Sequence, residues 1–204
     1  DIPFDGRRAY EYLQALCKIG PRPSGSPGMK AQQELLVAHF EKLGAEVSLQ
    51  SFTGVDPRNR APVPMANFVA RFFPERTERI LLCAHYDTLP YPLRDRVNPR
   101  GRFVGANDGA SGVALLMELA HRLDGISEGL GVDIVFFDGE EFIFSEWDPY
   151  FQGSEFFAHS YSESRSQRKW RYRAAVLVDM VGDADLQIYQ ERNSAWWRDS
   201  RWIV

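Results

Sequence analysis

Three short apolar runs in this sequence each lead directly into residues that bind metals or move protons. Residues 80–84 precede His85 and Asp87, residues 134–137 precede Glu140 and Glu141, and residues 174–178 precede Asp179. A short apolar run bounded by a turn signal is typical of a strand buried on both faces of a sheet. In an open α/β sheet, ligands bind at the carboxyl ends of such strands. The sequence therefore predicts one metal site built from the ends of three strands.

The spacing of His85 and Asp87 suggests how a histidine ligand would be oriented. Residues two apart on a strand point the same way, so the Asp87 carboxylate can accept the proton of one imidazole nitrogen while the other nitrogen binds a metal. A histidine and an aspartate at a strand end are also common in ordinary turns. This pair alone does not choose between the two interpretations.

The adjacent carboxylates Glu140 and Glu141 are more informative. Two acids at the end of a buried strand repel each other and lose hydration unless a cation or a proton compensates them. Neighbouring side chains also project differently, so one can bind a metal while the other acts as a general base. A further acid, Asp108, stands at the start of a predicted helix, where capping of the helix is the competing role. The alternative that all these acids are surface loop residues requires several independent coincidences.

The remaining pattern predicts the elements that hold these side chains. Apolar residues at helical spacing indicate helices over residues 5–19, 29–43, 109–123 and 154–161, and a Trp-rich helix start over 193–202. Alternation or short apolar runs indicate strands near residues 47–51, 67–73, 80–84, 134–137 and 174–178. This alternation predicts a single α/β domain, a three-layer sandwich whose mixed, mostly parallel sheet is flanked by helices.

Composition limits the classes of function. The 204 residues suffice for one domain with a real core, and the formal net charge of -4 gives no electrostatic case for nucleic acid or an anionic membrane. The basic segment 165–173 is interpreted as a solvated connection rather than an RNA contact. No apolar run approaches the roughly 18 residues of a membrane span. Cys17 and Cys83 are too few for a disulfide framework, and we expect both to be reduced thiols.

Four ordered motifs resemble the zinc aminopeptidases of metallopeptidase clan MH, whose fold is shared by the glutaminyl cyclases. The motifs are His85-Tyr86-Asp87-Thr88, Gly105-Ala106-Asn107-Asp108-Gly109-Ala110-Ser111-Gly112, Phe137-Asp138-Gly139-Glu140-Glu141 and Val178-Asp179-Met180-Val181-Gly182. The resemblance covers nearly the whole chain. It implies a zinc-exopeptidase-like fold, one or two zinc ions as cofactor, and peptide or protein N-termini as substrates.

The resemblance also implies a role for each candidate residue. In the di-zinc aminopeptidases one aspartate bridges two zinc ions, a histidine and a second aspartate complete the first site, and a glutamate completes the second. A further glutamate is the general base, and a further aspartate hydrogen-bonds the metal-binding histidine. By resemblance, Asp108 is the bridging aspartate, His85 and Asp179 complete the first site, and Glu141 completes the second. Glu140 is the general base, and Asp87 is the aspartate that hydrogen-bonds His85.

In the cyclases, the resemblance implies a single zinc on the equivalents of Asp108 and Glu141 and on a histidine late in the chain. The Asp179 equivalent there belongs to a hydrogen-bond network near the base. Both branches need the late histidine, yet every histidine of this chain is earlier than or remote from that place: His39, His85, His121 and His159. We therefore expect that the chain is a fragment without the C-terminal strands, or that another chain supplies them. The same absence leaves open a non-catalytic binding protein.

The choice between the two branches depends on the segments around the motifs. An aromatic insertion over residues 142–152 contains Trp147, which matches a tryptophan that lines the substrate pocket of the cyclases. The segments 193–197 and 25–28 also resemble the cyclases, whereas 107–112 is closer to the peptidases. The lead prediction is a glutaminyl-peptide cyclotransferase, which converts N-terminal glutamine to pyroglutamate and releases ammonia, and the alternative is a di-zinc aminopeptidase.

Location and assembly are less constrained. The first residue is Asp rather than Met, so we expect a processed or cut N-terminus. The family resemblance favours a secreted or periplasmic protein. The sequence does not indicate an oligomeric state.

Overall fold

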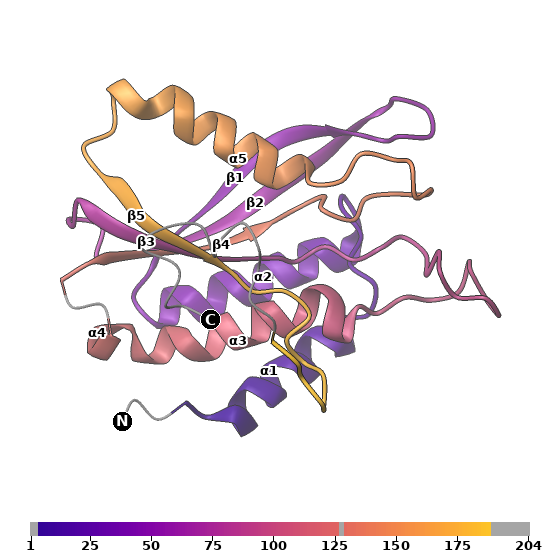
Figure 1. The fold of residues 1–204 in the computed structure, drawn as a ribbon, viewed down its shortest axis with the longest axis horizontal. Helices are drawn as coiled ribbons and strands as arrows, with labels where there is room; N and C mark the ends of the chain where they lie inside the picture. The colour runs from indigo at the N-terminus through magenta and orange to yellow at the C-terminus, as the bar shows by residue number, and fades with distance from the viewer. Residues whose placement is uncertain (1–3, 127–128, 189–204) are drawn as a thin grey trace.

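The computed structural model describes residues 4–126 and 129–188 and arranges them around one five-stranded sheet (Figure 1). In spatial order the strands are β1 (Glu46–Val55), β2 (Pro62–Phe72), β4 (Gly131–Phe137), β3 (Glu78–His85) and β5 (Arg171–Leu177). The β1–β2 and β2–β4 pairs are antiparallel, whereas β3 is parallel to both β4 and β5. The predicted mixed sheet is confirmed, and the three strands expected to end at the site are parallel neighbours.

Helices cover both faces of the sheet (Figure 1). The helices of one face are α1 (Gly6–Ile19), α2 (Pro27–Lys42), α3 (Ser111–Leu119), the 3-10 turn Ala120–Arg122 and α4 (Leu123–Ile126). The other face carries α5 (Gln152–Glu163), followed by the 3-10 turn Ser164–Ser166. The predicted three-layer sandwich is therefore confirmed. None of the helices in the described ranges combines the length and apolar character needed to span a bilayer.

The core follows from the alternation of side chains along the central strand β4, all of whose residues are buried. Ile134 and Phe136 point toward α1, α2 and α3 and join the larger apolar cluster, while Val135 and Phe137 pack with Phe157 of α5. Burial on both faces explains why this strand reads as a continuous apolar run.

The expected elements differ from the observed ones in two places that matter for function. The strand 174–178 was predicted to be buried, but β5 is largely exposed, because among the described residues it pairs only with β3. The predicted helix 109–123 is interrupted, since regular α-helix begins only at Ser111 and ends at Leu119. The predicted Trp-rich helix start lies outside the described residues.

A buried polar layer crosses the sheet near the amino ends of β3 and β5. The Asp133 carboxylate of β4 accepts hydrogen bonds from Arg79 Nε (3.1 Å), Arg71 Nε (3.3 Å) and the Tyr172 hydroxyl (2.6 Å). Asp133 and Arg79 are both 0% exposed. Because every charge in this layer has a partner, the layer joins β2, β3, β4 and β5 in a fixed register.

Candidate metal centre

The three parallel strands bring their carboxyl ends to one edge of the sheet. His85 is the last residue of β3, Glu140 and Glu141 lie in the turn after β4, and Asp179 follows β5 by two residues. Backbone hydrogen bonds extend the pairing beyond the strands, from Tyr86 N to Phe137 O (3.1 Å) and from Val178 N to Cys83 O (2.9 Å). The predicted convergence of these side chains is a direct result of strand order.

Asp108 enters the site from a tight π-helical turn, Ala106–Ala110, that precedes α3. The turn is closed by a hydrogen bond from Ala110 N to Gly105 O (3.1 Å), and Asp108 has the non-helical angles φ -89° and ψ 109°. Gly109 adopts φ +86°, and a Cβ there would lie 2.7 Å from Asp87 O. Asp108 does not cap α3, whose N-cap is Ala110.

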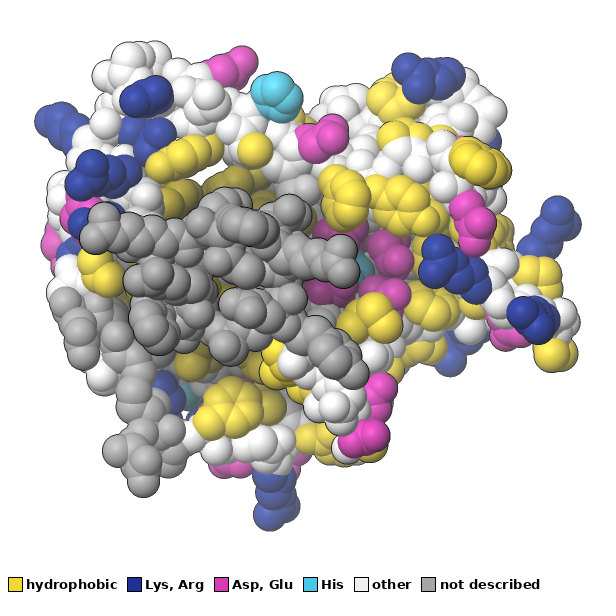
Figure 2. All heavy atoms as spheres, in the orientation of Figure 1, with side chains coloured by type: hydrophobic (Ala, Val, Ile, Leu, Met, Phe, Trp, Pro, Cys, Tyr) yellow, Lys and Arg dark blue, Asp and Glu magenta, His cyan; other side chains and the backbone are white. Residues whose placement is uncertain are grey.

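His85, Asp108 and Asp179 each place one potential ligand atom within 4.8 Å of the others. His85 Nε2 lies 3.1 Å from Asp108 Oδ1 and 3.3 Å from Asp179 Oδ1, and His85 Nδ1 lies 3.5 Å from Asp87 Oδ1. Figure 2 shows acidic side chains around part of a histidine ring, in a hollow bordered by hydrophobic side chains. The structure therefore brings together the three residues that the resemblance assigns to one metal.

The unsatisfied atoms of this group fit a metal ion. Both ring nitrogens of His85 are buried, and neither makes a well-aligned hydrogen bond among the described residues. One imidazole nitrogen and two carboxylates are ligands that zinc accepts, and the nearby Asp87 carboxylate is a typical orienting partner for a zinc-bound histidine. Burial alone would lower the pKa of His85, but Asp108, Asp179 and Asp87 together raise it well above its usual range. The three carboxylates stabilise a positive charge at this position. In the metal-free protein this charge is the proton on His85, and a bound metal ion can take its place.

Glu141 stands beside this group rather than in it. Its Oε2 atom is buried without a hydrogen-bond partner in the described structure, and burial followed by the charge of Asp108 raises its pKa to about 8. After burial, the charge of Asp108 has the largest effect on the pKa of Glu141. Its predicted role as a metal ligand is therefore compatible with the geometry and stays a prediction.

Glu140 is held at the site by its backbone. The Asp87 carboxylate accepts hydrogen bonds from Glu140 N (3.2 Å) and Glu141 N (2.9 Å), so the buried acid that lies 3.5 Å from His85 Nδ1 also fixes the turn with the two glutamates. Burial, and to a lesser extent neighbouring acids, raise the pKa of Glu140 to about 7. A carboxyl group with this pKa exchanges protons readily near neutral pH, as a general base requires.

Two further contacts that sequence reasoning missed hold the edge together. The Asp179 loop is attached to the Asp108 turn, since Gly182 N donates to Asn107 Oδ1 (2.7 Å) and Val181 N donates to Ser111 Oγ (3.1 Å). Both Asn107 and Ser111 belong to the motif that contains Asp108, and their side-chain hydrogen-bonding capacity was the available signal.

The second missed contact involves Asp138, a buried acid that precedes the two glutamates. Its carboxylate accepts hydrogen bonds from Ser24 Oγ (2.6 Å) and Ala66 N (3.0 Å). Burial raises the pKa of Asp138 to about 7. The signal in the sequence was an acid directly after an apolar strand, but nothing in the sequence indicated Ser24 as its partner.

The predicted pocket residue Trp147 does not contact the metal centre in the described structure. Its side chain is 94% exposed, in the loop between β4 and α5, and its backbone N donates to Ser145 Oγ (3.2 Å). Its role in substrate binding stays a prediction. The two cysteines of the chain are free, as expected.

The other histidines lie away from the site. Two of them lie among the helices of the α1–α4 face: His121 Nε2 is 2.8 Å from the Tyr12 hydroxyl, and His39 Nε2 is 3.0 Å from Met117 O. The third, His159, is exposed on α5. None of these three belongs to the candidate ligand group found among the described residues, which is consistent with the expectation that they are not metal ligands.

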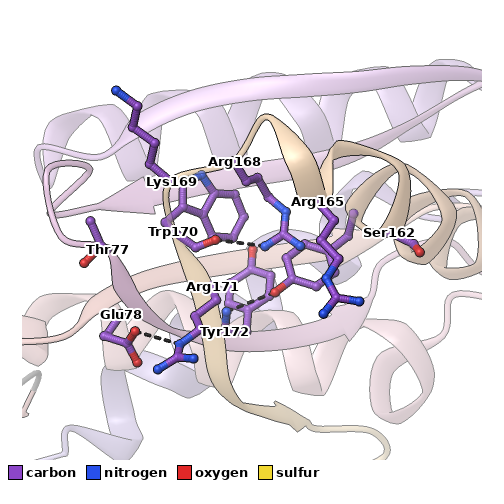
Figure 3. A pocket seen from close by; sticks show the side chains of 10 residues that line it. Thr77, Glu78, Ser162, Arg165, Arg168, Lys169, Trp170, Arg171 and Tyr172 are labelled. Carbon is purple, nitrogen blue, oxygen red and sulfur yellow. Dashed lines mark hydrogen bonds and ion pairs between the residues drawn. The ribbon is translucent and has the colours of Figure 1, made fainter.

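A separate pocket of about 680 Å³ lies at the opposite, amino ends of β3 and β5 (Figure 3). It is lined by Thr77, Glu78, Tyr161, Ser162, Arg165, Arg168, Lys169, Trp170, Arg171 and Tyr172. Its acid, Glu78, pairs with Arg171 (2.7 Å), and the Arg168 guanidinium stacks 3.5 Å above the Tyr161 ring. The pocket lies at the ends of β3 and β5 opposite to those that carry His85 and Asp179, so it is separate from the candidate centre.

Comparison with known proteins agrees with the geometry. The chain is 47% identical to Fimbriiglobus ruber glutaminyl cyclase, with a TM-score of 0.82 over 87% of this chain and 62% of that one. It is 29% identical to a leucine aminopeptidase precursor from Bacteroides thetaiotaomicron, with a TM-score of 0.79 over 91% of this chain and 66% of that one. It is also 29% identical to the Bos taurus glutaminyl-peptide cyclotransferase-like protein, covering 89% of this chain and 50% of that protein.

The chain thus spans about half the length of the curated relative just described. Residues 67–202, which include the whole candidate centre, match the sequence profile of Peptidase family M28. The fold, the ordered motifs and this match lead to one conclusion: the chain belongs to Peptidase family M28.

Proposed function

We propose that this protein is a zinc-dependent enzyme that acts on the N-terminal residue of peptides, with cyclisation of N-terminal glutamine as its reaction. The observation that carries the zinc-dependent enzyme, whichever branch it belongs to, is the convergence of His85, Asp108 and Asp179 within 4.8 Å, with Glu140 fixed beside them by Asp87. The 47% identity to a bacterial glutaminyl cyclase supports the cyclase branch.

The residues of the chain suggest how this reaction would proceed. Bound zinc would act as a Lewis acid that polarises the γ-carboxamide carbonyl of the substrate. Glu140 would take a proton from the substrate α-amine as its nitrogen attacks the amide carbon. The new C–N bond closes the ring, the bond to the amide nitrogen breaks, and Glu140 returns the proton to the departing ammonia. A pKa of about 7 suits both halves of this transfer.

A specific observation favours an aminopeptidase as the second candidate. His85 joins Asp108 and Asp179 in one group, which matches the ligand set that the resemblance implies for the first of two zinc ions. In that reaction Glu140 would take the proton of a water molecule that attacks the first peptide bond. The number of zinc ions that bind distinguishes the two candidates.

The secreted or periplasmic location that the family resemblance favours stays a prediction.

The experiment compares a glutaminyl and a leucyl fluorogenic substrate on the protein produced full-length from its gene, together with metal analysis. We expect pyroglutamate formation from the first substrate, about one zinc per chain, and loss of turnover in Glu140→Gln with zinc retained. Hydrolysis of the leucyl substrate without cyclisation, together with two zinc ions, would establish the aminopeptidase. No bound zinc and no turnover would identify a non-catalytic binding protein, the remaining alternative.

A further inference from the structure

Arg22 is a fully buried cation that pairs with no carboxylate among the described residues. It is 0% exposed, and its guanidinium donates to four main-chain carbonyls, Gly20 O (2.7 Å), Val104 O (2.9 Å), Gly105 O (3.3 Å) and Leu16 O (3.5 Å). Burial lowers its pKa to about 10, so it remains charged at neutral pH. A buried charge without a counter-ion is unfavourable, which makes its presence beside a cluster of acids informative.

The carbonyl of Gly105 links Arg22 to the turn that presents Asp108. Gly105 O accepts both the Arg22 Nη2 hydrogen bond and the Ala110 N–H bond that closes the π-turn. Gly105 itself has φ +60°, and a Cβ there would lie 2.4 Å from Asp108 O. Arg22 therefore holds the first residue of a turn whose geometry decides where the Asp108 carboxylate lies.

The backbone of Arg22 reaches the other acidic loop. Arg22 N donates to Thr88 Oγ1 (3.0 Å), and Thr88 N donates back to Arg22 O (3.3 Å). Thr88 directly follows Asp87, the acid that orients His85 and the two glutamates. One residue thus connects the segment that carries Asp87 with the segment that leads to Asp108.

Because Arg22 hydrogen-bonds carbonyl groups, the carboxylates of the metal centre stay available as metal ligands. An arginine that formed an ion pair with a site carboxylate would occupy the oxygens needed by a metal. The Nη1 and Nη2 groups of Arg22 donate to carbonyls, and two of these, Leu16 O and Gly20 O, lie at the C-terminal end of α1, where the helix dipole concentrates partial negative charge. Its charge still acts on Asp87 through space.

We propose that Arg22 is a positioning residue for the metal centre: it fixes the Asp108 turn against the Asp87 loop and supplies a permanent positive charge without consuming a ligand atom. The inference rests on the metal site of the proposed function. It assigns to Arg22 control of metal affinity and ligand geometry, beyond a contribution to folding.

The test measures zinc affinity by chelator competition and the visible absorption of the cobalt-substituted protein, using full-length protein. Arg22→Met should weaken zinc binding about 10- to 100-fold and alter the cobalt spectrum. Arg22→Lys should recover the affinity only in part, since one ammonium group does not span the four carbonyls. In an Asp108→Asn background, Arg22→Met should have little further effect, because the two residues act through the same turn.

The core variant Leu36→Ala, in α2, is the control for lost stability, and it should lower the unfolding midpoint without changing zinc affinity. If Arg22→Met fails to fold, Arg22→Lys and Thr88→Val carry the test, and both should weaken zinc binding. Wild-type zinc affinity and cobalt spectra in those variants would overturn the inference while leaving the proposed function intact. A wild-type protein that binds no zinc would refute both.

Discussion

Replacing Asp87 with asparagine should weaken zinc binding strongly while changing the stability of the metal-free protein little. Asp87 is 0% exposed, and its two oxygens accept the backbone N–H groups of Glu140 and Glu141 at 3.2 and 2.9 Å while Oδ1 faces His85 Nδ1. Asparagine keeps the shape but offers a single acceptor oxygen. One N–H group of the glutamate turn then loses its partner, and the histidine loses a charged neighbour.

In the metal-free protein, Asp87→Asn causes energy changes of opposite sign, so the free energy of unfolding should change little. An unsatisfied buried N–H group costs about 1–3 kcal/mol. Removing the charge of Asp87 relieves its repulsion with the acids Asp138, Glu140 and Glu141, about 3 kcal/mol per pair at roughly 5 Å and an effective dielectric constant near 20, and it loses an attraction of the same order to protonated His85. Because several repulsions are relieved and one attraction is lost, the net relief is comparable to the cost of the N–H group. In the zinc-bound protein a cation already offsets that repulsion, so the relief is absent and the cost remains. The expected loss of affinity is about 10- to 100-fold, or about 1.4–2.7 kcal/mol.

The assay pairs chelator competition for zinc with urea unfolding of the metal-free protein, and Asp133→Asn is the matched control. Asp133 is equally buried, lies at the opposite end of the same sheet and bonds Arg79. Its substitution leaves that arginine without a counter-ion and should cost about 3–5 kcal/mol of stability with no effect on zinc affinity. Zinc affinity within twofold of wild type in Asp87→Asn, or an equal loss in both variants, would refute the reasoning.

Three further predictions concern other parts of the molecule. Burial lowers the pKa of His39 below its usual 6.5, so the unfolded chain binds the proton more readily and stability should fall as pH drops below about 6.5; His39→Gln should reduce this slope in urea unfolding between pH 7.5 and 5, and an unchanged slope would contradict it. Gly153→Ala should lower the thermal midpoint, because its Cβ would lie 2.1 Å from Asp138 O and 2.4 Å from Asn67 Oδ1; a wild-type midpoint would mean that this contact relaxes freely. Trp147→Ala should leave stability within about 0.5 kcal/mol but raise KM for peptide substrates, and an unchanged KM would remove Trp147 from the pocket.

The sequence allowed the strand ends to be predicted because their signals are local. An apolar run before His85, Glu140 or Asp179 reports burial of the strand and the point where it ends. Parallel pairing then brings those ends to one edge, so the constellation follows from topology without any knowledge of side-chain positions. The conclusion that these residues share one centre therefore needed only periodicity and a fold class.

Other features depend on contacts between distant segments and leave no local signal. The π-turn at Asp108 looks like an ordinary helix start in the sequence, and it differs only because Gly105 and Gly109 adopt positive φ. The partnership of Ser24 with Asp138 spans 114 positions. The exposure of β5 depends on what lies beside it in space, which apolar composition does not report.

The electrostatics at the carboxyl ends of the parallel strands indicate that the site binds a cation. Burial, and after it the charges of neighbouring acids, raises the pKa values of Glu140 and Glu141, and both effects weaken the fold rather than supporting it. At the other end of the same sheet, Asp133 is neutralised directly by Arg79, so the fold can satisfy a buried acid when stability is the requirement. At the metal centre the available arginine instead bonds carbonyls and leaves the carboxylate oxygens open. Because the two ends of one sheet treat buried acids so differently, the unpaired acids are best explained by a cation that binds them.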